Sequence, residues 1–187
     1  MRNVASWGLA PGIAALGLGA MLVGGCGQIG GAPTEQHPGA ADVERGRYLV
    51  AALDCNACHT PHDQTGRPIA GRELTGHPAG AILPQWDASM LEKGILATMN
   101  PTLTAYAGPF GVSVAANLTP DPETGTGNLT AAALIKSWRE GTRWQTGEPI
   151  KPPMPWSSYG QLTDEDIRAI HAYLMSLEPK KPEPLAG

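Results

Sequence analysis

The stretch Ala51–Asp63, AALDCNACHTPHD, places Cys55, Cys58 and His59 within five residues of one another. The chain has 187 residues and only three cysteines, and the third, Cys26, lies far upstream of this stretch. Two thiols followed at once by an imidazole indicate a site for a metal or a cofactor, and they argue against a framework of disulfides.

The CxxCH pattern favours covalent attachment of haem over the other uses of a CxxC pair. A thiol redox motif does not need the histidine, and a zinc site normally needs a second ligand pair. His62 and His77 are available, but the sequence has no second C-x-x-C and no H-x-x-x-H. We therefore predict one covalent haem c, with Cys55 and Cys58 forming thioether bonds and His59 binding the iron.

The second axial ligand is predicted to be Met154, in the stretch EPIKPPMPWSSYG. Prolines on both sides of Met154 fix the backbone, and a thioether that must meet iron at one point gains from that rigidity. His77 is the second choice. Of the remaining candidates, His37 lies in the tether, His62 is too close to His59 to reach the opposite face of the haem, and His171 is expected on the surface or in helix packing. Met90 and Met99 are expected to pack in the core, and Met175 falls off the apolar face of the last helix.

The surroundings of His59 lead to a further expectation. We expect the carbonyl of Pro68, in GRPIAG, to accept a hydrogen bond from Nδ1–H of His59. Such a bond fixes the tautomer and raises the basicity of the iron-binding nitrogen. Aromatic residues make up only 5% of the chain, with a single Phe, so the core lacks ring bulk that a haem can supply.

The charge of the chain argues against nucleic-acid binding. The formal net charge is -4 at pH 7, and the basic residues are scattered along the sequence. A nucleic-acid interface needs a concentrated positive face. The 24 glycines and 18 prolines indicate much loop and turn.

The N-terminus has the features of an export signal. Arg2 precedes a run without charge from Asn3 to Thr34, and LVGGC ends at Cys26. We predict a signal peptide of the lipoprotein type over residues 1–25, lipidation of Cys26, and a flexible Gly/Pro-rich tether over residues 26–41. A retained helix or a simple cleaved signal are the alternatives. Each places the remainder outside the cytoplasm, on the periplasmic side of a bacterial membrane.

Helical periodicity extends through the predicted haem domain, residues 42–178. One helix is expected over Val43–Leu53 after Asp42, and another within LTDEDIRAIHAYLMSL, where Thr163 caps the N-terminus. Asp87 and Thr130 precede two more, Ala88–Met99 and Ala131–Glu140. No alternating pattern of useful length predicts a strand, so we expect an all-α fold with long loops around the haem. Residues 179–187 are expected to be a disordered tail.

These residues together resemble the class I c-type cytochromes. The stretches FGVSVAANLTPDPETGTGNLT, REGTR, PPMPW and LTDEDIRAIHAYLMSL are similar to haem domains in cytochrome subunits of bacterial membrane-bound alcohol, aldehyde and sugar-acid dehydrogenases. The resemblance covers about residues 42–178. It implies that a helix bearing Gly46 crosses a helix bearing Tyr173, and that Asn117 and Thr119 lie near a haem edge. The chain departs from those subunits in having one CxxCH motif, where they often carry three haem domains, and a longer 74–108 segment.

The expected function is electron transfer. Two protein ligands leave the iron no free position for a substrate, so the protein should not be an enzyme in its own right. Its expected partners are a dehydrogenase subunit, another cytochrome or a terminal oxidase, with the membrane reached through the lipid anchor. A peroxidase-like haem enzyme and a haem-based gas binder are the alternatives, and both need a sixth position that opens to added CO or cyanide.

Overall fold

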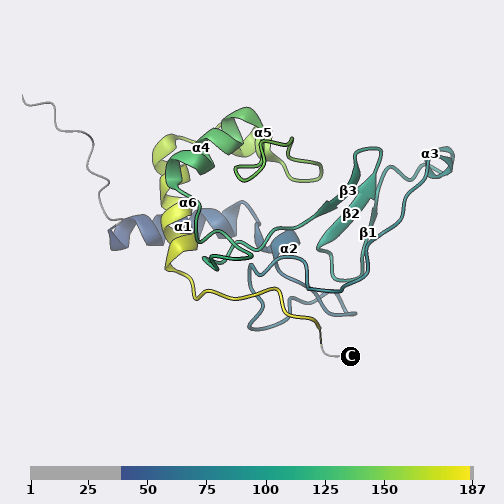
Figure 1. Ribbon diagram of the computed structural model, residues 1–187, viewed down its shortest axis with the longest axis horizontal. Coiled ribbons are helices and arrows are strands. Elements are labelled where there is room, and N and C mark those ends of the chain that lie inside the picture. The colour runs from purple at the N-terminus through teal and green to yellow at the C-terminus, as the bar shows by residue number, and fades with distance from the viewer. Residues whose placement is uncertain (1–38, 186–187) are drawn as a thin grey trace, which may run out of the picture. The chain divides into compact units, whose positions relative to one another are not determined.

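A computed structural model describes residues 39–185. The predicted signal peptide, Cys26, His37 and almost all of the tether lie outside the described residues, as do residues 186–187. Within residues 39–185, no helix is both long enough and apolar enough to cross a bilayer. The elements of this part are α1 (Ala40–Ala52), α2 (Asn56–His59), α3 (Ser89–Glu92), β1 (Thr98–Met99), β2 (Ala105–Gly108), β3 (Gly111–Val114), α4 (Ala131–Glu140), α5 (Trp156–Tyr159) and α6 (Asp164–Ser176) (Figure 1).

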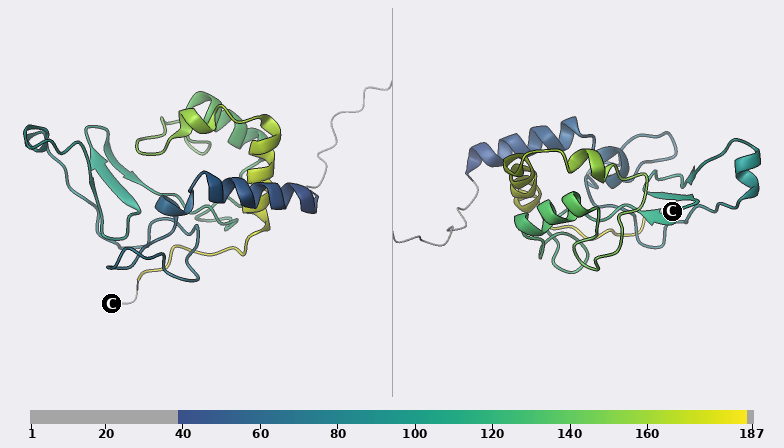
Figure 2. Two further views of the ribbon diagram at one scale, coloured as in Figure 1. Left: turned by 180° about the vertical axis from the view of Figure 1, so that it is seen from behind. Right: turned by 90° about the horizontal axis from the view of Figure 1, so that it is seen from above.

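Helices α1 and α6 pack across each other (Figure 2), and Gly46 lies at their closest contact. A Cβ atom at residue 46 would lie 1.9 Å from the carbonyl oxygen of Ala169 and 2.8 Å from Cβ of Tyr173, so only glycine permits this approach. The expected crossing of these two helices is therefore confirmed. Helix α1 begins at Ala40, earlier than predicted, and Gly39 is its N-cap residue. Asp42 therefore lies in the first turn, where its carboxylate accepts a hydrogen bond from the Gly39 amide at 2.9 Å.

Helices α4 and α5 complete the helical part: α4 packs on α6, and α5 packs on α4. Thr130 caps α4 by accepting from the Ala133 amide at 3.1 Å, and Thr163 caps α6 by accepting from the Asp166 amide at 3.1 Å. Both predicted caps are confirmed. The core that these helices share is aliphatic with two aromatic rings, and its buried members include Leu49, Val50, Leu74, Leu134, Trp138, Tyr159, Ile167, Ile170 and Leu174.

The fold is not purely helical, which corrects the all-α expectation. Strands β1, β2 and β3 form an antiparallel sheet in that order, with Thr98 opposite Ala107 and Tyr106 opposite Ser113. Each strand has four residues or fewer, which is too short for an alternating pattern to stand out in the sequence.

The predicted helix over Ala88–Met99 is wrong. Only the single turn of α3 forms, because Gly94 takes a positive φ of 74° and reverses the chain, and residues 98–99 continue as β1. Met99 is 58% exposed and does not pack in the core, contrary to expectation. We call residues 81–99 the apolar arm, since several of its large side chains face solvent: Ile82, Leu83, Leu91, Ile95, Leu96 and Met99.

The C-terminal segment departs from the expected disordered tail. Residues 179–185 are described, and they run beside loops that precede α4 in the chain (Figure 1). The Lys180 carbonyl accepts from Nδ2 of Asn117 at 2.6 Å, and the Pro182 carbonyl accepts from the Ala79 amide at 2.7 Å. Within this extended segment the Glu183 amide donates to the Lys181 carbonyl at 2.8 Å, and the Lys180 and Pro182 carbonyl groups accept from distant donors instead.

Candidate functional site

A cavity of about 790 Å³ lies between the helical part and the sheet, and it is large enough for a cofactor. Cys55, Cys58, His59 and Met154 all line it. Residues of helix α2 and of the loop that leads into α5 both contribute to its wall. The structure thus brings together four residues that the sequence places up to about a hundred positions apart.

The CxxCH motif forms a tight turn immediately after α1. The Cys55 amide donates to the Val50 carbonyl at 3.2 Å, and the His59 amide donates to the Cys55 carbonyl at 3.0 Å. This turn places both thiols and the imidazole on the cavity wall. The two cysteines are not joined in a disulfide. Burial, with smaller contributions from Asp54 and Cys58, raises the pKa of the Cys55 thiol to about 11, so the thiol is protonated at neutral pH.

The imidazole of His59 is held in one tautomer. Its Nδ1 atom lies 2.7 Å from the carbonyl oxygen of Ala116. Because a carbonyl oxygen only accepts, Nδ1 carries the proton and Nε2 keeps its lone pair for a metal. Burial lowers the pKa of His59, while the hydrogen bond to Ala116 opposes that shift. The neutral form, which is the form that binds iron, is favoured.

The acceptor for His59 is Ala116 and not Pro68, which corrects our expectation. Pro68 belongs to an exposed loop in which it pairs with His62, and the Ile69 amide donates to the Pro61 carbonyl. That loop folds back on itself. Ala116, which follows β3, supplies the carbonyl that Pro68 was expected to supply. No local signal in the sequence points His59 to an acceptor 57 residues away.

Met154 lies partly buried against the core in a loop that is tied down at several points. The Ile150 amide donates to the Gly141 carbonyl at 2.8 Å, and Nζ of Lys151 donates to the Val112 carbonyl of β3 at 3.1 Å. The indole of Trp156 packs against Gly141, where an added Cβ would lie 2.6 Å from the ring. These contacts restrain the loop on both sides of Met154.

The other histidine and methionine candidates in the described residues do not line this cavity. Nδ1 of His77 lies 2.9 Å from Oγ1 of Thr104, and Nε2 of His171 lies 2.7 Å from the Leu129 carbonyl. His62 is buried, and within residues 39–185 its Nδ1 atom has no hydrogen-bond partner. Of the two residues expected near a haem edge, Asn117 lines the cavity, whereas Thr119 lies outside it and is 1% exposed.

Two tyrosines that carry no motif in the sequence also shape the cavity. The hydroxyl of Tyr106 donates to the Leu103 carbonyl at 2.7 Å and lies 3.1 Å from Sγ of Cys58. The hydroxyl of Tyr159 donates to the Leu53 carbonyl at 2.9 Å, and burial raises its pKa to about 12. Both hydroxyls stay protonated and hold the ends of the CxxCH segment in place. A single tyrosine in a four-residue strand or helix carries no sequence signal for such a role.

The residues around the cavity fit a haem c. Two thiols, a neutral imidazole and a thioether supply the two covalent attachments and a nitrogen and a sulfur donor. The remaining wall is largely apolar, as a porphyrin face requires, and includes Val50, Leu118, Leu129, Leu134, Trp138, Ile150, Ile170 and Leu174.

Comparison with known proteins agrees with this geometry. The family model for cytochrome c matches residues 43–178. The chain is 35% identical over 144 residues to one of the subunits of nicotinate dehydrogenase from Pseudomonas putida, covering 77% of this chain and 9% of that protein. It is 32% identical over 147 residues to the fructose dehydrogenase cytochrome subunit of Gluconobacter japonicus, covering 77% of this chain and 24% of that protein.

A third relative is the cytochrome c subunit of alcohol dehydrogenase (quinone) from Gluconobacter oxydans, 32% identical over 145 residues, covering 78% of this chain and 23% of that protein. The chain therefore matches less than a quarter of the length of each of these relatives. The family model spans most of the chain, including the CxxCH turn, the Met154 loop and both crossing helices. The chain belongs to the cytochrome c family.

Proposed function

We propose that this protein carries one haem c with His59 and Met154 as axial ligands and relays electrons from a dehydrogenase toward the respiratory chain. Family membership itself implies a covalently bound c-type haem and a role in electron transport. The observation that carries the finer proposal is the shared cavity onto which Cys55, Cys58, His59 and Met154 all open.

The roles of the chain's own residues follow from this arrangement. Cys55 and Cys58 hold the cofactor in place, and His59 binds through Nε2 because Ala116 keeps its proton on Nδ1. The restrained loop presents the Met154 sulfur to the other axial position. When bound, the haem supplies a one-electron iron couple, and methionine ligation raises its potential relative to two histidines.

The proposed donor is a dehydrogenase. The names of the relatives support this, because two of them are called cytochrome subunits of a fructose and an alcohol dehydrogenase. With both axial positions filled by the protein, the iron exchanges electrons and binds no substrate, so the chain acts as a carrier. Export through the N-terminal signal, with lipid on Cys26, would place the domain on the periplasmic face of the membrane.

The test of the ligand set is replacement of Met154. Met154→Ala should abolish the near-infrared band of a methionine–Fe(III) bond and lower the midpoint potential by on the order of 0.1 V, a fraction of the range of about 0.8 V that axial ligands span. Met99→Ala is the matched control, because Met99 is exposed and does not line the cavity. A Met154 variant that keeps both the band and the potential would assign the ligand to another residue.

Exogenous ligands separate the carrier from the alternative functions. If Met154 occupies the iron, added CO or cyanide should leave the absorption spectrum of the parent protein unchanged over minutes and should bind rapidly to the Met154→Ala variant. Rapid binding to the parent would favour a peroxidase-like enzyme or a gas binder.

A further inference from the structure

We propose that residues Glu178–Pro182, which we call the strap, position the Ala116 carbonyl for its hydrogen bond with His59 and thereby set the potential of the iron. This inference rests on the proposed function, in which His59 is an axial ligand. It assigns a role to a segment that follows the last helix, outside the haem cavity.

One side of the Ala116 segment is fixed by residues 74–77. The His77 amide donates to the Ala115 carbonyl at 2.9 Å, and the Leu118 amide donates to the Leu74 carbonyl at 2.8 Å. Gly76 lies against the peptide itself, since a Cβ there would come within 2.5 Å of the Ala116 carbonyl carbon. These contacts prevent the segment from moving toward residues 74–77.

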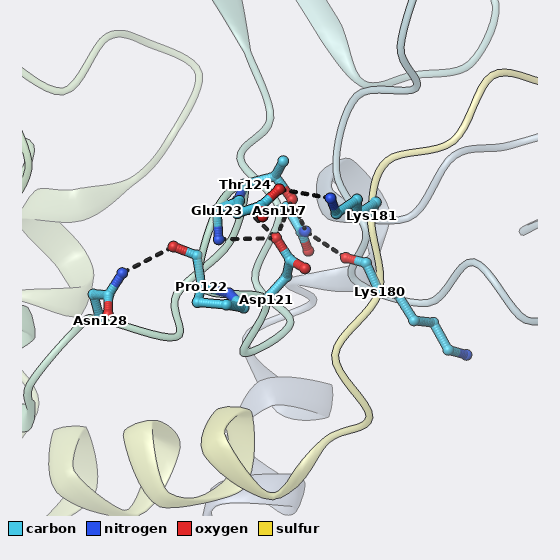
Figure 3. Close-up of polar contacts among 8 residues, drawn as sticks. All are labelled: Asn117, Asp121, Pro122, Glu123, Thr124, Asn128, Lys180 and Lys181. Atoms are coloured by element: carbon cyan, nitrogen blue, oxygen red, sulfur yellow. Dashed lines mark hydrogen bonds and ion pairs between the residues drawn. The ribbon is translucent and has the colours of Figure 1, made fainter.

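The strap holds the other side, as Figure 3 shows for Asn117 and Lys180. Nδ2 of Asn117 donates both to the Lys180 carbonyl at 2.6 Å and to Oγ1 of Thr124 at 3.0 Å. The Lys180 amide in turn donates to Oγ1 of Thr119 at 3.1 Å. Asn117 and Thr119 are 5% and 1% exposed, so water cannot readily replace the strap as their partner.

These bonds reach His59 through one peptide group. The carbonyl of Ala116 and the amide of Asn117 belong to the same planar unit, so the carbonyl cannot turn unless the Asn117 backbone turns with it. Anchoring Asn117 and Thr119 to the strap therefore fixes the direction of the oxygen that lies 2.7 Å from Nδ1 of His59.

The expected consequence has a definite sign. A hydrogen bond from Nδ1–H to a carbonyl raises the basicity of Nε2, which stabilises oxidised iron and lowers the midpoint potential. Loosening the strap should lengthen that bond and raise the potential. A strap that only stabilises the fold would change the unfolding transition and leave the potential of the folded protein unchanged.

The experiment compares two substitutions at Lys180 in the haem-loaded protein. Lys180→Pro removes the backbone donor to Thr119, whereas Lys180→Ala keeps that donor and loses only the side-chain contacts with Gly71 and Glu178. Both variants lose the same charge. We expect a higher midpoint potential and faster solvent exchange of the His59 Nδ1 proton in Lys180→Pro than in Lys180→Ala. Equal values in the two variants would overturn the proposal.

A second pair tests the same contact from the other side. Thr119→Val replaces the hydroxyl with a methyl group, keeps the shape of the side chain and should raise the midpoint potential. Thr119→Ser keeps a hydroxyl and should have the midpoint potential of the parent protein. Thr102→Val is the control, because Thr102 is also buried and hydrogen-bonded but contacts neither the strap nor the cavity. A Thr119→Val potential equal to that of Thr102→Val would contradict the inference. In the parent, absence of histidine ligation would instead refute the proposed function.

Discussion

Gly46 of α1 and Ala169 of α6 approach so closely that a Cβ atom at residue 46 would lie 1.9 Å from the Ala169 carbonyl oxygen. The obstacle is backbone, which cannot move aside as a side chain can. We predict that Gly46→Ala forces the two helices apart and destabilises the haem-loaded protein by about 3 kcal/mol, the upper part of the usual range for overpacking. Denaturant unfolding followed by far-UV circular dichroism measures this difference.

Gly39→Ala is the matched control for that crossing. Gly39 precedes α1, and an added Cβ there would meet only the Asp42 carboxylate at an ordinary 3.7 Å. Gly39→Ala should therefore lower the free energy of unfolding much less than Gly46→Ala does. A similar decrease in the free energy of unfolding for the two variants would mean that glycine at the crossing contributes through chain flexibility alone.

Covalent attachment of haem is expected to depend on both cysteines. Each single variant, Cys55→Ser or Cys58→Ser, leaves one thiol on the cavity wall and should retain some attached haem, while the double variant should retain none. Extraction with acidified acetone, followed by haem staining of the denatured polypeptide, measures attachment directly. Free extraction of haem from the parent protein would refute the assignment of the CxxCH motif.

The anchor is expected to depend on Cys26, outside the described residues. Cys26→Ala should leave the haem spectrum unchanged and should prevent lipidation, so that the protein leaves the membrane fraction or keeps its signal. One acyl chain binds a membrane only marginally, so stable anchoring requires a multiply acylated cysteine. Mass spectrometry of the N-terminal peptide checks the modification. An unmodified Cys26 in membrane-bound parent protein would favour a retained helix.

His77 should make stability depend on pH without affecting the iron. Burial lowers the pKa of His77, so the unfolded chain binds a proton more readily than the folded protein does. Stability attributable to this group is present above the ordinary histidine pKa of about 6.5 and declines as the pH falls below it. His77→Asn should reduce the loss of stability between pH 7 and pH 5. Its haem spectrum should match the parent, and an altered spectrum would revive His77 as a ligand.

The parts of the fold that the sequence predicts are those with short-range causes. Thr163 precedes an acidic first turn and an apolar face with helical spacing, and the structure confirms the helix and its cap. The CxxCH motif carries its chemistry within five residues, so its place on the cavity wall could be predicted from the sequence alone. Met154 also lies on that wall, in the proline-rich loop where the sequence predicts the second ligand, although its bond to iron stays a prediction.

The parts that the sequence does not predict depend on contacts between distant residues. Ala116 accepts from His59 across 57 positions, and the strap binds Asn117 across 63, so neither contact has a local pattern. The helix predicted over Ala88–Met99 does not form for a different reason. Its apolar residues have the spacing of a buried face, but Gly94 reverses the chain and leaves Leu96 66% exposed. Apolar spacing indicates a helix only where another part of the protein covers the apolar side.

The apolar arm, residues 81–99, affects how the isolated protein behaves in solution. Ile82 is 71% exposed and Leu96 66%, and the arm carries only three charged side chains, Asp87, Glu92 and Lys93. Exposed apolar patches of this kind favour association and adsorption. A net charge of -4 gives only modest repulsion between molecules, and salt screens it further. Solubility should therefore fall as salt is raised, and Leu96→Lys should improve the yield of monodisperse protein while leaving the haem cavity untouched.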